Sequence, residues 1–592
     1  MKTAQPRRAV ILGVVVALGL AACGKDAAPS TTQGSAPTAE STATEGSVAT
    51  SDSSPSGDSV ATDGSVTTDG SAAPAADGPA GVPAGADTVL TPAPTGEADS
   101  AVWATYRETS TLDPIFGFDY PDNSAMAVAC ESLLRQNPDL TIGPGLAESA
   151  EYTTDTSLVI TLRSDVTFWD GSPMTPDDVV FSLKRQQDPA NGGFYATVLS
   201  NATDIAATGD NEVTITTTGR DMLLRNELSG PVGVVTQKAF VEAKGADYGT
   251  ANGGVMCTGP YQLKSWVVGE GLTFDRYDGY WDKSLPLKLK SITIKGVPDE
   301  AALTAGLLTG EIDGTYSLGL STLDQLRGSD QVTVSQGGAY AIAAFIVSDF
   351  TGTLADARVR QALSMAIDRQ GIVSSVFKGA AYPARAIGVP GMWGYAKETF
   401  TEGWNALPDV SQPDVEGAKQ LVIDAGAEGK TVRIGMSSEL AAIQTEAGEF
   451  QRAAESIGLK AELVSVSAAN YINFFIDPAA RESVDGFFTV NYSNTADPLS
   501  LFVSLVAPGG TQAFNGYDDP AAQALLDQAR AEPDDTKRAA LVVQFQKLIT
   551  DEVLWVPMVA PTTTLIMNKE LSGAPATFQY MFGPWAAYLG AA

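Results

Sequence analysis

The sequence predicts an α/β protein with mixed sheets and more than one lobe, preceded by a long segment outside the fold. Stretches typical of strands and of helices alternate along residues 98–592. This part of the chain, roughly 495 residues, is longer than a single hydrophobic core normally supports. Residues 23–97, in contrast, lack the aromatic side chains that a core needs. Alternating strands and helices favour sheets covered by helices, distributed over two or more lobes.

Residues 1–22 have the pattern of a secretory signal peptide. Two arginines precede an apolar run, 9–20, that is too short to span a bilayer comfortably. The run ends in Leu-Ala-Ala before Cys23, which resembles the lipobox of bacterial lipoproteins. The resemblance implies that Cys23 carries fatty-acyl chains such as palmitate and holds the protein on the outer face of the cell membrane, which is the periplasmic side if the cell has an outer membrane. The alternative is a plain secretory signal in which Cys23 is incidental.

Residues 23–97 have the composition of a disordered tether. They consist mainly of Ser, Thr, Ala, Gly, Pro and Asp, with short repeats and no aromatic residue. Such a segment cannot bury enough apolar surface to offset the entropy lost on ordering. A flexible chain of this length has a root-mean-square reach of roughly 45–50 Å. We therefore expect a globular body that stays near the membrane and is free to move over it.

Within the body, several segments have clear strand or helix patterns. Residues 157–162 and 212–216 alternate polar and apolar side chains, as half-buried strands do. Thr175 is followed by Pro and two acidic residues, a favourable start for a helix. A second helix is predicted after Asp356, and a third over 534–552, because each has an apolar stripe with helical spacing.

The chain contains no histidine, which excludes several kinds of catalytic and metal site. Ser-His-Asp catalysis, Cys-His catalysis and His-Glu-x-x-His zinc sites all need an imidazole. The net charge of −33 argues against nucleic acid or anionic lipid headgroups as partners. No later apolar run is long enough to span a membrane. The sequence therefore predicts a body that is not an enzyme, needs no cofactor or metal, and is anchored only at its N-terminus.

Apart from Cys23, the chain contains Cys130 and Cys257. An even pair of cysteines in a secreted protein indicates one disulfide, because the compartment is oxidising. The alternative is two buried free thiols. We expect the disulfide.

The segment 168–182 reads Phe-Trp-Asp-Gly-Ser-Pro-Met-Thr-Pro-Asp-Asp-Val-Val-Phe-Ser. It resembles a strand-turn-helix signature of the extracellular solute-binding proteins of ABC importers. The resemblance is to the peptide-binding family, family 5, which includes oligopeptide- and dipeptide-binding proteins. Further segments resemble the family in the same order, namely Glu131–Leu134, Thr258–Tyr261, Trp266, Tyr280–Trp281, Gly310–Asp313 and Arg358–Arg369.

The resemblance implies a two-lobed, periplasmic-binding-protein-like fold with a hinge between the lobes and an extra subdomain in lobe I. The implied boundaries are 98–339 for lobe I, about 137–230 for its subdomain, 340–554 for lobe II and 555–592 for the return to lobe I. The ligand binds the closed form better and so shifts the hinge towards closure. The implied role is that of a monomeric receptor delivering a peptide or other small polar solute to an ABC permease and its ATPase.

The resemblance also implies part of the ligand site, at the end of a lobe II strand in 487–498. In peptide-binding relatives an aspartate pairs there with the α-ammonium of the peptide, three positions before the acid of an acid-Pro pair. Asp497-Pro498 resembles that pair, so the corresponding residue here is Asn494. A neutral amide forms no ion pair, and a charge-assisted hydrogen bond is roughly twice as strong as a neutral one. Recognition of a free peptide N-terminus therefore needs another acid.

We expect Asn491, Tyr492, Asn494 and Asp497 to contact the ligand, with Asp497 as the nearest acid for an ammonium. One alternative is a blocked peptide, an opine, a sugar or another polar solute. Another is that these polar residues simply end the strand. Nickel is also bound within the family, but this chain has no imidazole to ligate it.

Two aromatic loops are further candidates for ligand contact. Trp393 lies in the loop 390–395 of lobe II, and Phe116 ends the loop 109–116 after the first strand of lobe I. The alternative for each is packing that does not involve the ligand.

Two other functions are alternatives to solute delivery. A sensor could use the same hinge closure to signal to a membrane kinase instead of supplying a permease. A secreted hydrolase is disfavoured, because the chain lacks histidine and a Gly-x-Ser-x-Gly nucleophile elbow.

Overall fold

The computed structural model describes residues 78–592, apart from 318–319, 507–509 and 511. The predicted signal peptide, the predicted lipidation residue Cys23 and most of the predicted tether lie outside the described residues. Within the described ranges, no helix has the length and apolar character needed to cross a membrane.

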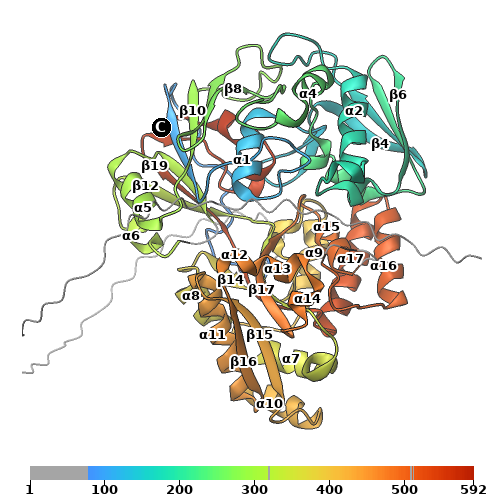
Figure 1. The fold of residues 1–592 in the computed structure, drawn as a ribbon, viewed down its shortest axis with the longest axis vertical. Coiled ribbons are helices and arrows are strands. Elements are labelled where there is room, and N and C mark those ends of the chain that lie inside the picture. Colours follow the sequence, from blue (N-terminus) through green and yellow to red (C-terminus); the bar gives the residue numbers. More distant parts are fainter. Residues whose placement is uncertain (1–77, 318–319, 507–509, 511) are drawn as a thin grey trace, which may run out of the picture. The chain divides into compact units, whose positions relative to one another are not determined.

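A seven-stranded mixed sheet forms the centre of lobe I (Figure 1). Its strand order is β12-β19-β11-β1-β10-β9-β8, and β1 pairs in parallel with both β10 and β11. The strands are β1 Ala101–Thr105, β8 Tyr261–Val267, β9 Gly271–Arg276, β10 Ser291–Gly296, β11 Gly314–Ser317, β12 Val332–Gly337 and β19 Thr563–Asn568. Trp103 of β1 packs against Tyr316 and Trp585, so aromatic side chains fill this part of the core.

The remaining elements of lobe I are short. The helices are α1 Tyr120–Ala129, α2 Pro176–Gln187, α3 Met222–Glu227, α4 Lys238–Lys244, α5 Glu300–Thr309 and α6 Leu323–Arg327. Two small two-stranded sheets pair β2 Leu134–Gln136 with β3 Ile142–Pro144, and β20 Leu571–Ser572 with β21 Gly590–Ala591.

A separate antiparallel sheet in lobe I has the order β4-β5-β7-β6 and lies within the region expected for the extra subdomain. Its strands are β4 Ala147–Thr154, β5 Ser157–Leu162, β6 Ala202–Gly209 and β7 Glu212–Thr217. The predicted strands are confirmed, since β5 and β7 alternate buried and less buried residues. The predicted helix start is confirmed too, because Thr175 and Asp178 form a reciprocal capping box at α2.

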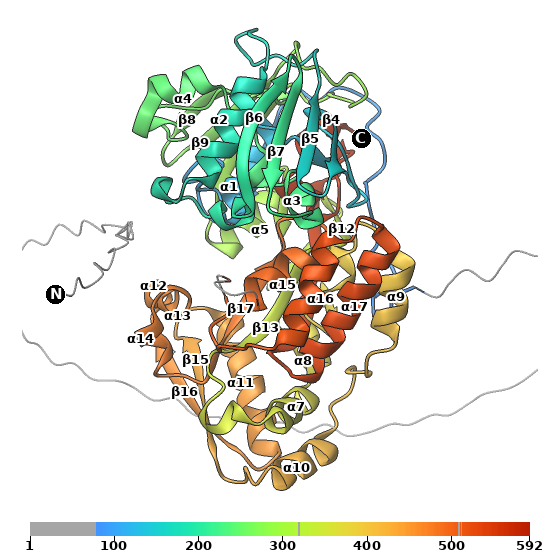
Figure 2. The ribbon, with the colours of Figure 1, turned by 90° about the vertical axis from the view of Figure 1, so that its right-hand side faces the viewer.

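Lobe II is built on a six-stranded mixed sheet with the order β14-β18-β13-β17-β15-β16 (Figure 2). The strands are β13 Ala341–Val347, β14 Ala381–Pro383, β15 Thr431–Ser437, β16 Lys460–Val466, β17 Gly486–Tyr492 and β18 Trp555–Pro561. The helices are α7 Ala357–Ala366, α8 Arg369–Ser375, α9 Lys397–Asn405, α10 Val415–Asp424, α11 Ala441–Ser456, α12 Ala468–Tyr471, α13 Asn473–Ile476, α14 Pro478–Arg481, α15 Pro498–Val506, α16 Pro520–Ala531 and α17 Asp535–Asp551. The helices predicted after Asp356 and over 534–552 are confirmed as α7 and α17.

The chain crosses between the two sheets twice. It leaves lobe I after β12 and enters lobe II at β13, so the first crossing lies at 338–340. The return differs from the predicted boundary at 555, because β18 pairs with β13 and β14 in lobe II. Only β19 rejoins the lobe I sheet, which moves the second crossing to Thr562.

Residues 78–97 depart from the prediction of a tether that extends to 97. The Thr88 amide donates to the Gln336 carbonyl at 3.0 Å, and the Ala591 amide donates to the Gly96 carbonyl at 2.9 Å. The side chain of Trp404 donates to the Ala80 carbonyl at 2.9 Å. Although the segment has little apolar surface of its own, its backbone groups find partners on the body. The described part of the predicted tether, residues 78–97, is therefore packed against the body.

Cys130 and Cys257 are joined in a disulfide within lobe I. Cys130 directly follows α1, and Cys257 lies shortly before β8. The bond therefore links the first helix of lobe I to the sheet strand that follows the subdomain.

Candidate ligand-binding site

A cavity of about 560 Å³ lies between the lobes, within the usual volume range of small-molecule sites. From lobe I it is lined by Phe118, Phe194, Tyr195, Thr197, Val198, Ser200, Asp221, Leu223, Leu224 and Glu227. From lobe II it is lined by Asn491, Tyr492, Asn494, Ser500, Leu501, Val503, Ser504, Gly510, Gln512 and Arg530. A ligand held there touches both lobes, so binding and the relative position of the lobes are coupled.

A second cavity, of about 300 Å³, lies entirely in lobe I beside the carboxyl ends of β1 and β11. Its lining is largely aromatic and aliphatic, with Trp103, Tyr120 and Tyr580 among its walls. Because lobe II contributes no residue to it, occupation of this cavity does not by itself link the lobes. The interlobe cavity is therefore the better candidate for a hinge-coupled site.

The lobe II wall presents neutral polar groups at the end of β17. The Asn491 side chain donates to Gln512 Oε1 at 2.5 Å. The Tyr492 hydroxyl donates to the carbonyl of Phe118 in lobe I. The backbone carbonyl of Asn494 accepts from Gln136 of lobe I at 2.9 Å. The predicted residues Asn491, Tyr492 and Asn494 are thus brought together on one wall, and two of them contact the opposite lobe.

The lobe I wall presents carboxylates at the two ends of α3. Asp221 caps the helix by accepting from the Leu224 amide, and Glu227 is its last residue. Arg530 of α16 pairs with Asp221, its Nε lying 3.2 Å from Oδ1. Ser500 of α15 donates to Glu227 Oε1 at 2.6 Å. Through these contacts α3 packs against α15 and α16 of lobe II (Figure 2).

Burial dominates the electrostatics of Glu227. The pKa of this carboxyl is raised to about 7, mainly by loss of solvent, which the hydrogen bond from Ser500 opposes. Repulsion from Asp497 and Asp221 contributes to this rise, and the amide of Asn494 counteracts it. A carboxyl with a pKa near neutrality responds to any charge that enters the cavity.

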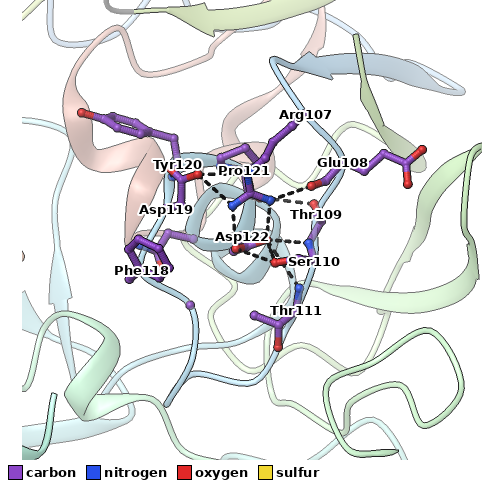
Figure 3. Close-up of polar contacts among 12 residues, drawn as sticks. Arg107, Glu108, Thr109, Ser110, Thr111, Phe118, Asp119, Tyr120, Pro121 and Asp122 are labelled. Carbon is purple, nitrogen blue, oxygen red and sulfur yellow. Dashed lines mark hydrogen bonds and ion pairs between the residues drawn. The ribbon is translucent and has the colours of Figure 1, made fainter. Parts of the chain in front are cut away.

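The loop before α1 forms the rim of the cavity at Phe118 (Figure 3). Arg107 lies at its centre and pairs with Asp119 at 2.8 Å and with Asp122 at 2.9 Å. Asp122 also accepts from the Ser110 amide at 2.7 Å. This network holds the loop against the start of α1, which places the Phe118 carbonyl where Tyr492 reaches it.

Asp497 is not placed at the cavity. Its side chain has no exposed surface and accepts hydrogen bonds from Asn226, Tyr395 and the Leu499 amide at 2.9, 3.1 and 3.0 Å. Burial raises the pKa of its carboxyl, while the charge of Arg538 lowers it. The carboxylate is thus used to tie lobe II to lobe I, and contact with an ammonium would require these bonds to break.

The two aromatic candidates are not at the cavity either. Trp393 is 3% exposed and stacks on Phe400 inside lobe II. Its ring is therefore part of the lobe II core and does not line the cavity. Phe116 is 38% exposed and is not among the lining residues, which include Phe118, whose ring lies 4.4 Å from that of Phe194. No residue of the predicted loop 109–116 lines this cavity, and Phe118 follows that loop by two positions.

Sequence reasoning missed Asp221, Glu227 and Arg530. One signal was available, because Glu227 lies four positions after Leu223 and three after Leu224, which places it on their face of a helix. An acid there must be buried with the helix or face a cavity. The pairing of Asp221 with Arg530 joins residues far apart in the chain, so no local pattern indicates it. In the part of the chain that the structure describes, no cluster of acidic and cysteine side chains has the form of a metal site.

Curated relatives are similar to this chain over most of its length. The oligopeptide-binding protein OppA of Bacillus subtilis is 24% identical over 503 residues, which cover 80% of this chain and 90% of OppA. The glutathione-binding protein GsiB of Escherichia coli K12 is 25% identical over 486 residues, which cover 80% and 92%.

Solved structures confirm the two-lobed α/β fold. Helicobacter pylori DppA, a periplasmic binding protein in complex with the peptide STSA, has a TM-score of 0.69 and 20% identity, and the match covers 84% of this chain and 98% of DppA. The binding protein AgaA of A. tumefaciens R10, in complex with agropinic acid, has a TM-score of 0.67 and 21% identity, with coverage of 83% and 96%.

The family model for the bacterial extracellular solute-binding proteins, family 5 Middle, matches residues 141–513. The match includes the subdomain, the first crossing and β17, and so spans both walls of the interlobe cavity. The chain belongs to family 5 of the bacterial extracellular solute-binding proteins.

Proposed function

We propose that this protein is the substrate-binding component of an ABC importer, which captures a peptide or peptide-like solute between its lobes and delivers it to the permease. The observation that carries the proposal is the interlobe cavity of about 560 Å³, lined by both lobes with amide, hydroxyl, carboxylate and aromatic groups. Family membership supports the role, since the relatives OppA and GsiB are named for binding an oligopeptide and glutathione.

The lining suits a peptide-like ligand. Amides at Asn491, Asn494 and Gln512 can donate to and accept from the backbone of a peptide. Phe118 and Phe194 supply flat apolar surface on which side chains of the ligand can pack. The lining also contains a buried acid, Glu227.

Hinge closure would couple binding to delivery. Among the described residues the two sheets are joined by crossings at 338–340 and at Thr562, and a change in a few backbone dihedrals there moves one lobe relative to the other. The segment 80–88 also runs from α9 of lobe II to β12 of lobe I, so it moves with the hinge. A ligand that bridges the walls favours the closed arrangement by its difference in affinity for the two states. The permease would then distinguish the closed from the open form.

The lipobox-like sequence supports attachment to the outer face of the cell membrane through Cys23. Cys23→Ser should release the protein from the membrane fraction and leave ligand binding unchanged, because the substituted residue lies far outside the cavity in sequence. Fractionation of cells expressing each form, followed by immunoblotting, measures this. Retention of the variant in the membrane fraction would contradict lipid anchoring.

A second candidate is a binding protein for a non-peptide polar solute such as an opine. The neutral amide at Asn494 favours it, because an amide forms hydrogen bonds with uncharged polar groups but no ion pair with an ammonium. The likeness to AgaA, whose structure contains agropinic acid, is compatible with this candidate.

Native mass spectrometry of the gently extracted full chain tests the proposal. We expect a bound small molecule whose fragments are those of a peptide. Val503→Trp, which places a large side chain on the cavity lining, should abolish this retention. Val490→Trp is the matched control, since Val490 is exposed on β17 and does not line the cavity. A retained opine or sugar would favour the second candidate, and equal retention by both variants would show that another site binds the solute.

A further inference from the structure

The charged groups of the interlobe cavity are unequally satisfied. Among its described lining residues the acids are Asp221 and Glu227, and the base is Arg530. Arg530 is committed to Asp221, with Nε 3.2 Å from Oδ1 and Nη2 against Oδ2. Asp221 also accepts from Asn201 at 3.0 Å and from the Leu224 amide at 3.3 Å. Its charge is therefore neutralised and its oxygens are occupied.

Glu227 has no such counterpart. Its side chain is 1% exposed, and Oε1 accepts from Ser500 at 2.6 Å. Oε2 is buried and makes no hydrogen bond of normal geometry with the described residues, although the Asn494 amide lies near enough to lower the pKa of the carboxyl. Its position at the carboxyl end of α3 adds no positive charge, because the last carbonyls of a helix point that way. A buried carboxylate oxygen without a partner is unfavourable, and folded proteins keep few such groups.

The groups around Glu227 offer hydrogen bonds but no countercharge. Ser500 and Asn494 are neutral, and the nearby carboxylates Asp221 and Asp497 repel a negative charge. The cavity beside Glu227 thus has a negative potential that the protein itself does not cancel. A cation that enters the cavity would supply the missing partner for Oε2.

We propose that the Glu227 carboxylate accepts a hydrogen bond from an ammonium group of the bound solute. This lobe I residue then selects ligands that carry a positive charge at one end. The inference rests on the proposed solute-binding function and adds the residue and the charge that it recognises. The amides of the lobe II wall then bind the neutral polar groups of the same ligand. Because Ser500 of lobe II also bonds to Glu227, the ammonium binds at a point where the two lobes meet.

A library of random tripeptides tests this, half with free amino termini and half N-acetylated. It is offered to the full chain after bound solute has been removed by dialysis, and the retained peptides are counted by mass spectrometry. A charge-assisted hydrogen bond contributes enough for the native protein to retain free-amine peptides at least ~10-fold over acetylated ones. Glu227→Gln keeps the shape of the side chain and should reduce that ratio to about one, with retention of acetylated peptides unchanged.

Two further variants separate this role from a structural one. Glu446→Gln is the matched control, because Glu446 is also a buried acid with a partnerless oxygen, but lies on α11 away from the cavity. It should leave the preference for free amines intact. The double variant Glu227→Gln with Asn494→Asp carries its acid on the lobe II wall, next to residue 227. It should restore part of the preference for free amines.

The outcomes are distinct. A preference for free amines that persists in Glu227→Gln overturns the inference and leaves the proposed function standing. If the native protein retains free-amine and acetylated peptides equally, the inference is also overturned and the proposed function again stands. Retention of neither half overturns the proposed peptide-binding function, and this inference with it. Circular dichroism of each variant verifies that a lost preference does not come from a lost fold.

Discussion

The two lobes meet the cavity with different chemistry. Lobe I contributes a short helix, α3, with a carboxylate at each end, and lobe II contributes amides at the end of β17 together with Arg530. Lobe I is also cross-linked by the Cys130–Cys257 disulfide. In the recognition that we propose, charge recognition and neutral hydrogen bonding fall to opposite walls, so only the closed arrangement offers both.

A second contrast lies within the lobe I wall itself. Asp221 and Glu227 are carried by the same helix, and both are buried. Asp221 has a guanidinium partner from lobe II, whereas Glu227 has a hydroxyl. One acid therefore holds the lobes together without a ligand, and the other is left for the ligand.

The largest effect is expected from the disulfide, which lobe II lacks. Replacing Cys130 and Cys257 by Ser should destabilise the protein by about 4–5 kcal/mol in the chain-entropy model, because the bond closes a long loop in the unfolded chain. Urea unfolding followed by tryptophan fluorescence measures the loss. Lobe I should unfold first in the variant. Labelling of two reactive thiols in the unreduced, denatured native protein would contradict the cross-link.

Removing the partner of Asp221 tests the contrast between the two acids. Arg530→Gln leaves Asp221 buried without a countercharge and should cost about 3 kcal/mol of unfolding free energy. The double variant Asp221→Asn with Arg530→Gln should recover most of the loss. Arg358→Gln is the control, because its pair with Asp356 is largely exposed and contributes at most about 1 kcal/mol. Equal losses in Arg530→Gln and Arg358→Gln would refute an interlobe role for the buried pair.

The pH dependence of stability sharpens the contrast further. The pKa of Glu227 rises from 4.5 in the unfolded chain to about 7 in the folded protein. Between these values the folded state holds the proton and the unfolded state does not, so stability falls as pH rises from about 4.5 to 7. The titratable groups that act on Glu227 are Asp221 on its own helix, Asp497 and Tyr195. Arg530 also lines the cavity, but is paired with Asp221.

The difference between the native protein and Glu227→Gln isolates this contribution, which should reach roughly 2–3 kcal/mol across that range. Retention of free-amine peptides should change in the opposite direction and strengthen with rising pH, because only the ionised carboxylate attracts an ammonium. Glu446→Gln should remove a similar pH dependence that extends to about pH 8, without any effect on retention. A flat difference between the native protein and Glu227→Gln would show that Glu227 is solvated.

The smallest effect concerns a part of lobe I remote from the cavity. Thr175→Ala removes the N-cap of α2 and should lower stability by about 1 kcal/mol. Peptide retention should not change, since Thr175 does not line the cavity. Thermal unfolding measures the first quantity and the tripeptide library the second. A changed preference for free amines would mean that the whole subdomain, and not the α3 wall alone, sets the charge selection.

Local patterns in the sequence were sufficient for the regular elements. Alternation over 157–162 predicted β5, and the Thr175 cap predicted the start of α2, because both depend on neighbours in the chain. The resemblance of 168–182 to a family signature, and of other segments in the same order, was sufficient for the two-lobed fold.

Boundaries and contacts depended on the tertiary structure. The family resemblance assigned residues 555–561 to the return into lobe I, and only the pairing with β13 shows that β18 belongs to lobe II. The Gly- and Pro-rich segment 78–97 has no apolar pattern, yet its backbone binds the body. Neither result follows from composition, since hydrogen bonds between distant segments leave no periodic signal in the sequence.

The sequence by itself determined that this protein has no imidazole side chain, that its body carries one pair of cysteines, and that the polar residues Asn491, Tyr492 and Asn494 lie at and just after the end of β17. The tertiary structure decided which acid is free. Asp497 is the acid closest to these residues in the chain, but its carboxylate already accepts hydrogen bonds from Asn226 and Tyr395. Glu227, distant in sequence, faces the cavity because α3 packs against α15 and α16, and burial of a charge depends on which side chains surround it in space.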